Sequence, residues 1–253
     1  MIPRLSIITV TFNSEKTIER TLKSVAAQTY KNIEHIVIDG ASTDGTLNII
    51  EKYKDGLSYF RSESDRGVYD AMNKGIAVAR GDVIAFLNSD DFYEDHHTLN
   101  RIASEMKDEQ IDAVFGNVVF FEAGQPARIV RKFNSNRFRA DMLAWGWMPA
   151  HPGLFVRKRV FDRVGVFRPE YRLAGDFEFM VRIFKDKEIN YKALDAVLVR
   201  MQLGGLSTQG LRSAWIAQQE LISACRQNGI SSNHLKLFSR YVFKIFEYKG
   251  FPW

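Results

Sequence analysis

Two adjacent carboxylates, Asp90 and Asp91, follow an unbroken apolar run over residues 83–87. The run is too short for a typical helix and has the length of a strand that is buried on both faces. A buried parallel strand that ends in acids delivers them to the carboxyl edge of its sheet, where open α/β sheets bind ligands. Because adjacent carboxylates repel each other, a divalent cation is their natural partner. The alternative is an acidic turn that only closes the strand and caps a helix over 96–106.

The first half of the sequence alternates between strand patterns and helix patterns, and these elements must position the acids. Strands are expected over four ranges: 5–11, 33–38, 57–61 and 83–87. Helices are expected over four more: 15–28, 46–52, 71–80 and 96–106. Asn13 or Ser14 is expected to cap the first helix. Such alternation within about ninety residues is typical of an α/β fold, with a right-handed parallel sheet covered by helices.

The pattern changes after residue 106. A hairpin is expected from strands over 113–121 and 128–133, because the residues between them are typical of a turn. An aromatic segment over 144–153 contains too much Gly and Pro for a helix. The remaining expected elements are a short strand over 153–156 and helices over 158–164, 175–187, 211–228 and 234–249.

Four clusters of polar or acidic residues stand where the expected parallel strands end. They are Thr11 with Asn13, Asp39 with Ser42 and Asp44, Asp65 with Arg66 and Gly67, and Asn88 with Asp90 and Asp91. Each cluster alone is more typical of a turn or a helix cap. Because the carboxyl ends of parallel strands share one edge, the four clusters together can converge on one ligand. A carboxylate such as Asp39 can accept hydrogen bonds from a nucleobase or a ribose.

The composition is that of an ordinary globular protein. The 253 residues carry a net charge of +5 and are 45% hydrophobic, which suits one large domain or a domain with an appendage. The positive charge suits anionic partners such as nucleotide phosphates, a lipid surface or nucleic acid. The single cysteine, Cys225, excludes an internal disulfide and indicates a reducing compartment. No apolar run has the length of a membrane span, and the N-terminus lacks the layout of a signal peptide.

Three stretches of the sequence together resemble the inverting glycosyltransferases of family 2, which have the GT-A fold. They are SIITVTFNSEKTIERTLKSVAAQTYKNIEHIVIDGASTDGT, ESDRGVYDAMNKGIAVARGDVIAFLNSDDFY and LAGDFEFMVRI, and the resemblance covers residues 3–205. It implies a Rossmann-like α/β fold whose mixed, mainly parallel sheet is flanked by helices. It also implies a catalytic domain over 1–206, with a nucleotide-sugar-binding half (1–106) and an acceptor-binding half (107–206). A C-terminal helical extension follows over 207–253.

The resemblance implies which residues bind the donor, a nucleoside diphosphate sugar with UDP as the expected nucleotide. The residues at nucleotide-contacting positions are Thr11, Asn13, Asp39, Asp65, Arg66, Asn73, Asn88 and Ser89. Asn88-Ser89-Asp90 stands in place of the family's DxD triplet, with Asp90 as the expected ligand of Mn²⁺ or Mg²⁺ and Asp91 as a second ligand. The sequence departs from the family at Asn88, whose amide oxygen can still bind a ribose or a metal-bound water.

Asp176 matches the acid that acts as general base in this family. An inverting transfer needs one carboxylate to accept the proton of the acceptor hydroxyl as that hydroxyl attacks the anomeric carbon. The alternative is that Asp176 only caps the helix behind Gly175. His151 and Trp147 are expected to face the acceptor, and burial in the core explains Trp147 equally well. The segment 204–207, GGLS, resembles a family loop near the diphosphate.

The C-terminal segment 233–253 combines basic, aromatic and aliphatic residues at helical spacing. Lys236, Arg240 and Lys244 lie on one stripe of the expected helix. A basic amphipathic helix of this kind can lie on an anionic membrane, which would suit an enzyme with a lipid-linked acceptor. Packing against the catalytic domain or against another subunit explains the same pattern, so the oligomeric state stays open.

Other classes of function fit the sequence less well. A dinucleotide-dependent oxidoreductase needs a GxGxxG turn after its first strand, and Thr11-Phe12-Asn13-Ser14 contains no glycine. A nucleic-acid binder needs clustered basic residues, whereas these are scattered among acids. A processive polymer synthase of the same family would carry transmembrane helices and a QxxRW motif, and the sequence contains neither. A non-catalytic nucleotide-sugar or glycan-binding module remains the alternative, although it would not need both Asp90 and Asp176.

The sequence therefore predicts a metal-dependent, inverting hexosyltransferase. It is expected to move one sugar from a UDP-sugar to a glycan or lipid-linked acceptor in surface polysaccharide assembly, such as that of lipopolysaccharide. Its expected location is the cytoplasm, at the inner face of the plasma membrane. The donor sugar, the acceptor and the linkage depend on the second half of the chain, where no motif encodes the orientation of a single hydroxyl.

Overall fold

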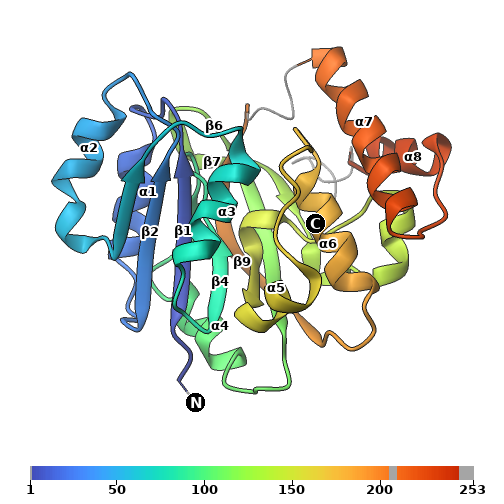
Figure 1. Ribbon diagram of the computed structural model, residues 1–253, viewed down its shortest axis with the longest axis horizontal. Coiled ribbons are helices and arrows are strands. Elements are labelled where there is room, and N and C mark those ends of the chain that lie inside the picture. The colour runs from blue at the N-terminus through green and yellow to red at the C-terminus, as the bar shows by residue number, and fades with distance from the viewer. Residues whose placement is uncertain (1, 205–209, 245–253) are drawn as a thin grey trace.

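The computed structural model describes residues 2–204 and 210–244 of the chain (Figure 1). Within this part, nine strands form one sheet in the order β3-β2-β1-β4-β8-β6-β9-β5, and β7 pairs with the outer part of β6. The strands are β1 (Leu5–Thr11), β2 (Ile33–Asp39), β3 (Tyr59–Ser62), β4 (Val83–Phe86), β5 (Phe92–Tyr93), β6 (Ala113–Glu122), β7 (Gln125–Phe133), β8 (Leu154–Arg157) and β9 (Tyr191–Gln202). The predicted α/β class is confirmed.

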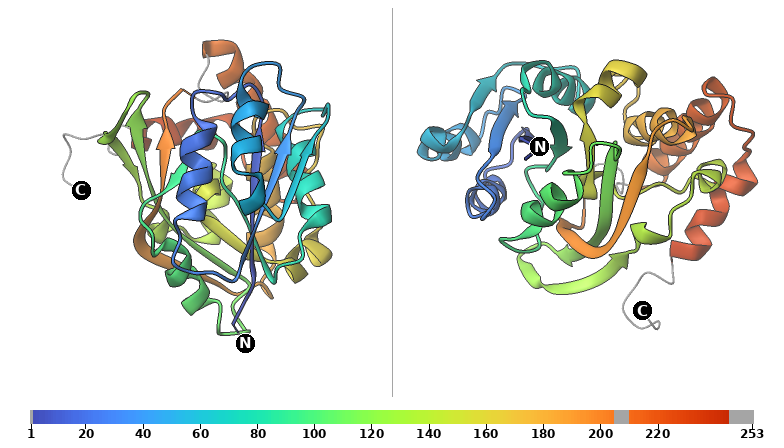
Figure 2. Two further views of the ribbon diagram at one scale, coloured as in Figure 1. Left: turned by 90° about the vertical axis from the view of Figure 1, so that its left-hand side faces the viewer. Right: turned by 90° about the horizontal axis from the view of Figure 1, so that it is seen from below.

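Helices cover both faces of the sheet (Figure 2). They are α1 (Ile18–Ala26), α2 (Thr46–Lys52), α3 (Val68–Val78), α4 (Thr98–Glu105), α5 (Lys158–Val164), α6 (Gly175–Lys185), α7 (Gly210–Gln227) and α8 (His234–Lys244). Four short 3₁₀ turns are η1 (Lys54–Gly56), η2 (Ser135–Arg137), η3 (Ala140–Trp145) and η4 (His151–Gly153). One face packs against α3, α5, α6 and α7, and the other against α1, α2 and α4.

The first half of the sheet is parallel. β1 lies between β2 and β4 and runs parallel to both, and β3 continues the parallel set beyond β2. Every residue of β1 and β4 is buried, and Ile8 faces one core while Ile7 faces the other. A side chain of this size contributes about 1.5–3 kcal/mol when it is fully buried. The apolar runs thus fix all four carboxyl ends at one edge of the sheet.

The second half of the sheet is mixed. β8 is antiparallel to both β4 and β6, whereas β6 is parallel to β9. β6 and β7 form the predicted hairpin. β5 and the long β9 were not predicted from the sequence. The pairing of β9 with β6 joins segments that lie far apart in the chain, so no local pattern indicates it.

Some predicted helix ends are wrong by a few residues. α1 begins at Ile18 rather than at residue 15, and neither Asn13 nor Ser14 caps it with a side chain. Asn13 has a positive φ of 47°, and its Oδ1 instead accepts a hydrogen bond from the Thr43 amide (2.8 Å). The main-chain carbonyl of Ser14 accepts the amides of Thr17 and Ile18. The turn before the helix thus replaces the predicted side-chain cap.

The C-terminal helices α7 and α8 lie at the opposite end of the molecule from α1 and α2 (Figure 1). Leu221, Cys225 and Leu237 are buried in the same core as α3 and α6, so these helices pack on the sheet-bearing part of the chain. The predicted helix over 234–249 is described as far as Lys244, and its continuation over 245–249 lies outside the described residues. Among the described helices, each is too short or too polar to cross a membrane.

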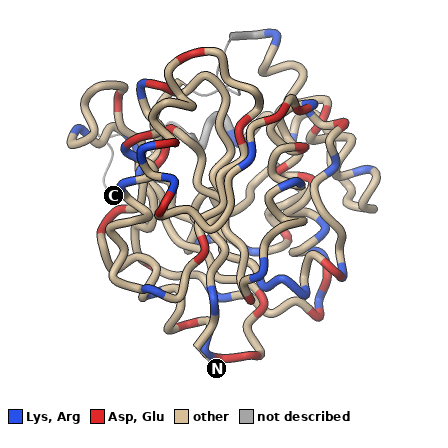
Figure 3. Tube along the Cα trace, turned by 60° about the vertical axis from the view of Figure 1, so that its left-hand side comes forward, with Lys and Arg blue, Asp and Glu red and all other residues tan. Residues whose placement is uncertain are grey.

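Acidic and basic residues are interspersed along the chain trace in Figure 3. Many of them form surface ion pairs, such as Arg101 with Asp95 (2.7 Å) and Arg139 with Asp141 (2.9 Å). This distribution agrees with the interpretation that the net positive charge is not gathered into a nucleic-acid-binding stripe.

Candidate active site

The acidic turn, residues 88–91, directly follows β4 at the carboxyl edge of the sheet. Its main chain is closed by a hydrogen bond from the Asp91 amide to the Asn88 carbonyl (3.1 Å). The Ser89 hydroxyl lies 2.8 Å from that of Ser14, which follows β1. The Asp91 side chain is buried, and its Oδ1 accepts a hydrogen bond from the Gln202 amide (3.3 Å). The segments after β1 and at the end of β9 therefore meet the turn that follows β4.

The turn holds more negative charge than its surroundings neutralise. Burial and the neighbouring Asp90 carboxylate raise the pKa of Asp91 well above its usual range. Burial also raises the pKa of Asp90, and the positive charge of Arg20 opposes this effect. Burial lowers the pKa of Arg20, and the two carboxylates oppose that change. A site of this kind gains electrostatic stability when a cation binds.

The residues of the turn fit a divalent cation that is shared with a diphosphate. Asp91 Oδ2 and Asn88 Oδ1 are both buried and have no hydrogen-bond partner. In the described part of the chain, no cluster of three or more His, Cys, Asp or Glu side chains could hold a metal unaided. Mg²⁺ is usually bound by one or two carboxylates together with substrate phosphates and water, and Mn²⁺ prefers the same oxygen ligands. Asp90 and Asp91 are two carboxylates of this kind on adjacent residues.

The ends of β1 and β2 lie side by side, with Thr11 paired in register with Asp39. Asp39 is fully buried, and its Oδ2 accepts bonds from the Ser42 amide (2.9 Å) and the Ser62 hydroxyl (2.6 Å). Oδ1 accepts one bond, from the Ser42 hydroxyl (2.5 Å), and so keeps one lone pair. Thr11 Oγ1 is buried without a partner. This edge thus retains unused hydrogen-bonding capacity.

Phe12 lies at the same edge and was not predicted from the sequence. It directly follows β1, is 61% exposed, and borders Gly40 and Asp65. A Cβ atom at Gly40 would lie only 2.6 Å from Asp65 Oδ2 and 3.4 Å from the Phe12 ring. An aromatic ring at a strand end, followed by polar residues, was the available signal. The three residues form a small surface beside Thr11.

Arg66 and Asn73 make contacts within the protein. Arg66 forms an ion pair with Asp70 (2.9 Å) on the first turn of α3, which raises the pKa of Arg66. The Asn73 side chain donates to the carbonyl of Phe167 (2.8 Å) and accepts from its amide (3.0 Å). Asn73 therefore fastens α3 to the segment before α6 in this structure.

Asp176 stands in the first turn of α6. Its Oδ1 accepts hydrogen bonds from the Phe177 amide (2.8 Å) and from the Tyr69 hydroxyl (3.3 Å). The Tyr69 ring packs on Gly175, where an added Cβ would lie 2.7 Å from the ring. Tyr69, on α3, was not predicted from the sequence, because its contact with Asp176 spans 107 residues. The carboxylate thus has one oxygen fixed and one, Oδ2, without a hydrogen bond to the described residues.

His151 lies in η4, beside the end of β4. Its ring stacks on Phe86, the last residue of β4, at a centroid distance of 5.3 Å. Burial lowers the pKa of His151, and the Asp176 carboxylate opposes this effect. Trp147 is half-buried, with its ring 6.2 Å from that of Phe133. His151 therefore packs on the last residue of β4, two residues before the acidic turn begins.

The predicted GGLS loop near the diphosphate is only partly described. Gly204 follows β9 with a positive φ of 108°, and residues 205–207 lie outside the described residues.

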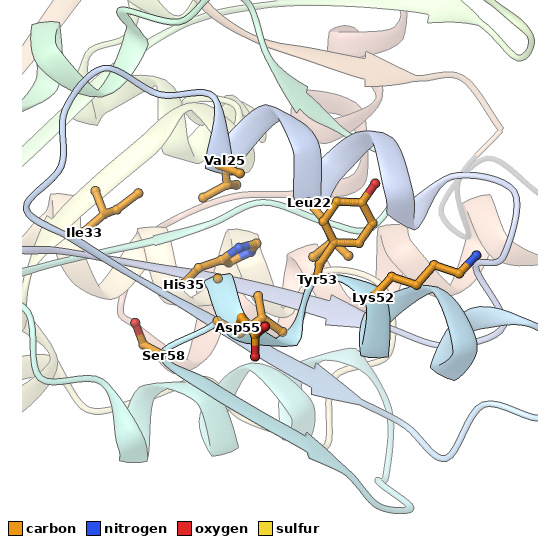
Figure 4. A pocket seen from close by; sticks show the side chains of 11 residues that line it. Leu22, Val25, Ile33, His35, Lys52, Tyr53, Asp55 and Ser58 are labelled. Atoms are coloured by element: carbon orange, nitrogen blue, oxygen red, sulfur yellow. The ribbon is translucent and has the colours of Figure 1, made fainter.

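A cavity of about 270 Å³ lies elsewhere, between α1, α2 and the start of β2 (Figure 4). Leu22, Val25, Ile33, His35 and Tyr53 are among its lining residues. Ile33 and His35 are the first and third residues of β2, whereas Asp39 is its last. The cavity therefore lies at the amino edge of the parallel strands, away from the polar strand ends.

The family model for glycosyl transferase family 2 matches residues 6–165. A glycosyltransferase of PGL/p-HBAD biosynthesis from Mycobacterium tuberculosis is 32% identical over 213 residues, which cover 81% of this chain and 79% of the relative. The Escherichia coli UDP-Glc:alpha-D-GlcNAc-diphosphoundecaprenol beta-1,3-glucosyltransferase WfaP is 40% identical over 163 residues, covering 64% of this chain and 62% of WfaP. The chain belongs to glycosyltransferase family 2 and is a glycosyltransferase.

Solved structures show the same architecture. Staphylococcus aureus TarS 1–349 in complex with UDP-GlcNAc superposes with a TM-score of 0.72 at 20% identity, covering 96% of this chain and 72% of TarS. The Pyrobaculum calidifontis mannosyltransferase PcManGT, in complex with GDP-Man and Mn²⁺, gives 0.65 at 20% identity, covering 96% and 70%. The fold is GT-A, as the resemblance implied.

His35 makes stability depend on pH. Burial lowers the pKa of His35 to about 4, whereas the unfolded chain protonates it near 6.5. Between these values the unfolded state binds more protons, so stability falls as the pH drops. We expect this group to remove about 2 kcal/mol of unfolding free energy between pH 7 and pH 5.

Urea unfolding at both pH values measures this loss, with His35→Gln as the test variant. Glutamine cannot titrate but can still bond to Thr9, whose hydroxyl lies 3.0 Å from His35 Nε2. The stability gap between wild type and His35→Gln should therefore change by about 2 kcal/mol between the two pH values. His96→Gln, at an exposed position, is the control. A gap that stays constant with pH would contradict a neutral, buried His35.

Proposed function

We propose that this glycosyltransferase is metal-dependent and inverting, and that it moves one sugar from a UDP-sugar to a hydroxyl of a glycan or lipid-linked acceptor. The observation that carries the proposal is the acidic turn just after β4, with buried and unpartnered oxygens of Asn88 and Asp91 at the carboxyl edge of the sheet. These residues can bind a cation and a donor diphosphate, and Asp176, whose charge acts on His151 beside Phe86 of β4, can accept a proton. This is the machinery that an inverting sugar transfer needs.

The nucleotide is proposed to lie across the ends of β1 and β2. Phe12 offers an exposed ring on which a base can stack, and Asp39 Oδ1 and Thr11 Oγ1 offer unused hydrogen-bonding capacity. Asn13, Asp65 and Arg66 border the same edge, with Asn88 and Ser89 toward the diphosphate. Asn73 is a weaker candidate because Phe167 occupies its amide group. The printed names of WfaP and of the TarS complex, which contain UDP, support UDP as the nucleotide.

Asp90 is proposed as the ligand of Mn²⁺ or Mg²⁺, with Asp91 as the second ligand. The bound cation would neutralise the charge that develops on the departing diphosphate. The buried and unpartnered Oδ2 of Asp91 supports this assignment. The Mn²⁺ in the PcManGT complex supports it at the level of the fold.

Asp176 is proposed as the general base. Tyr69 and the Phe177 amide fix its Oδ1, so Oδ2 is free to take the proton of the acceptor hydroxyl. The hydroxyl oxygen then forms a bond to the anomeric carbon from the face opposite the diphosphate. The bond from that carbon to the diphosphate oxygen breaks, and UDP leaves with the electron pair. Attack from the opposite face inverts the configuration of the anomeric carbon.

The acceptor is proposed to approach past His151 and Trp147, in the half of the chain over 107–206. WfaP's name describes a diphosphoundecaprenol-linked acceptor, and the mycobacterial relatives act in PGL/p-HBAD biosynthesis. These names support a glycan or lipid-linked acceptor and a role in surface polysaccharide assembly.

The surface of α7 and α8 supports contact with an anionic membrane. Trp215, Leu235 and Phe238 are 62%, 81% and 61% exposed. Trp215 stacks on His234 at 6.1 Å, so the exposed groups of the two helices adjoin. α8 contains three Lys or Arg residues and no Asp or Glu. Exposed aromatic and aliphatic side chains beside positive charge are typical of helices that lie on anionic lipid. The proposed location is accordingly the inner face of the plasma membrane.

The donor-site assignment predicts metal-dependent nucleotide binding. Asp90→Ala should weaken UDP binding in the presence of Mn²⁺ at least about tenfold, because the cation that bridges protein and diphosphate loses a ligand. Calorimetric titration with UDP and GDP, in Mn²⁺ and in EDTA, measures the effect. Asp95→Ala, which removes a surface pair with Arg101 and a hydrogen bond from the His97 amide, is the control. Equal binding by wild type and Asp90→Ala would remove Asp90 from the site.

The base assignment predicts a separation of turnover from binding. Asp176→Asn should lower the rate of sugar transfer or donor hydrolysis by about 10²–10⁴-fold, because the amide cannot accept the proton. UDP affinity should stay unchanged. Asp186→Asn, at the C-terminal end of the same helix and paired with Arg163, is the control. Full activity of Asp176→Asn would contradict the assignment.

The membrane assignment predicts a lipid-dependent loss in a surface variant. Replacement of Trp215, Leu235 and Phe238 by serine should weaken binding to vesicles of phosphatidylcholine and phosphatidylglycerol at least about tenfold, because each group contributes apolar area. Co-sedimentation measures it, with Val166→Ser, at another exposed apolar position, as the control. Unchanged binding, or equal binding to purely neutral vesicles, would show that this surface does not hold an anionic membrane.

A further inference from the structure

The first turn of α1 reaches the acidic turn through two side chains. Arg20 Nη2 donates a hydrogen bond to the main-chain carbonyl of Asp90 (2.9 Å). The Thr21 hydroxyl lies within reach of two more carbonyls of the turn, those of Asp91 (2.7 Å) and Asn88 (3.4 Å). Three of the four carbonyls of the turn are therefore engaged from one helix.

We infer that Arg20 and Thr21 are positioning residues that clamp the main chain of the acidic turn, so that its carboxylates face the donor diphosphate and its cation. The inference rests on the proposed metal-dependent donor binding. It assigns a role to α1, which contributes none of the predicted ligands.

The atoms that Arg20 contacts indicate positioning rather than charge pairing. An arginine beside two carboxylates usually forms bidentate hydrogen bonds with one of them. Arg20 instead donates to a carbonyl and to the side-chain oxygen of Gln202 (3.2 Å). The Asp90 carboxylate is thereby left available to a cation, although a guanidinium lies close by.

The clamp is itself held in place from the other side. The Arg20 guanidinium carbon lies 4.8 Å and 4.7 Å from the ring centroids of Phe92 and Phe121. The side-chain oxygen of Gln202 accepts from Arg20, and the main-chain N–H of Gln202 donates to Asp91 Oδ1 (3.3 Å). Two aromatic rings and the end of β9 thus fix the guanidinium, which in turn fixes the acidic turn. Thr21 is fully buried, so its hydroxyl has no water to replace these partners.

The test uses a matched pair at Thr21 and one variant at Arg20. Thr21→Val keeps the shape but removes the hydroxyl, whereas Thr21→Ser keeps the hydroxyl. Arg20→Lys keeps the charge but loses the planar group that reaches both acceptors. Arg200→Lys is the control. Arg200 lies two residues before Gln202 on the same strand, and the variant alters only its half-buried neighbourhood, including the ion pair with Glu94.

Calorimetric titration of UDP at fixed Mn²⁺ and in EDTA, with free Mn²⁺ followed by electron paramagnetic resonance, gives the first readout. Thr21→Val and Arg20→Lys should each weaken Mn²⁺-dependent UDP binding about tenfold, as supporting contacts of metal ligands typically do. UDP binding in EDTA should stay the same, and Thr21→Ser should recover most of the loss. Equal Mn²⁺ dependence in Thr21→Val and Thr21→Ser would overturn the clamp.

Hydrogen exchange of the free protein gives a second readout that does not need the metal. Amides of the acidic turn should exchange about tenfold faster in Thr21→Val than in Thr21→Ser, because the turn opens locally without its carbonyl contacts. If wild type shows no Mn²⁺-dependent UDP binding but this difference is present, the proposed metal site fails and the clamp stands. Equal exchange in the two variants would overturn the clamp whatever the metal does.

Discussion

The parallel pairing of β1 with β4 is the constraint on which the rest of the site depends. The register runs from Leu5 opposite Val83 to Ile8 opposite Phe86, and the Leu87 amide continues it by donating to the Ile8 carbonyl. Because both strands are buried on both faces, a shift of one residue would move each side chain into the opposite core, where it would not fit the packing. The register therefore fixes where the acidic turn emerges, which is beside Ser14 and the start of α1.

A turn with one buried and one half-buried acid is an unfavourable structure unless its main chain is well supported. The raised pKa values of Asp90 and Asp91 indicate that desolvation and mutual repulsion are not fully compensated in the protein alone. The compensation for the main chain comes from neutral or cationic donors that bond to carbonyls. The negative charge of the two carboxylates is thus left unbalanced, and a cation shared with a diphosphate would balance it.

The parallel half of the fold could be predicted from the sequence because its signals are local. Apolar runs of strand length alternate with amphipathic helices, and each strand pairs with a near neighbour in the chain. β9 could not be predicted in this way, because many of its residues are only half-buried and its partner β6 lies far away in sequence. The predicted start of α1 was wrong because a main-chain turn caps this helix, and such a turn has no characteristic residue in the sequence.

In the candidate site too, local patterns could be predicted and long-range contacts could not. The placement of Asp39 and Asp90 at one edge of the sheet could be predicted, because parallel topology alone brings strand ends together. Arg20 could not, since on a helical pattern a charged residue beside Glu19 reads as part of a solvated face. Tyr69 could not either, because its role comes from the packing of α3 against α6 at Gly175. The proposed base is therefore oriented by one helix from each half of the chain, and a change in the spacing of α3 and α6 would move the Tyr69 hydroxyl away from the Asp176 carboxylate.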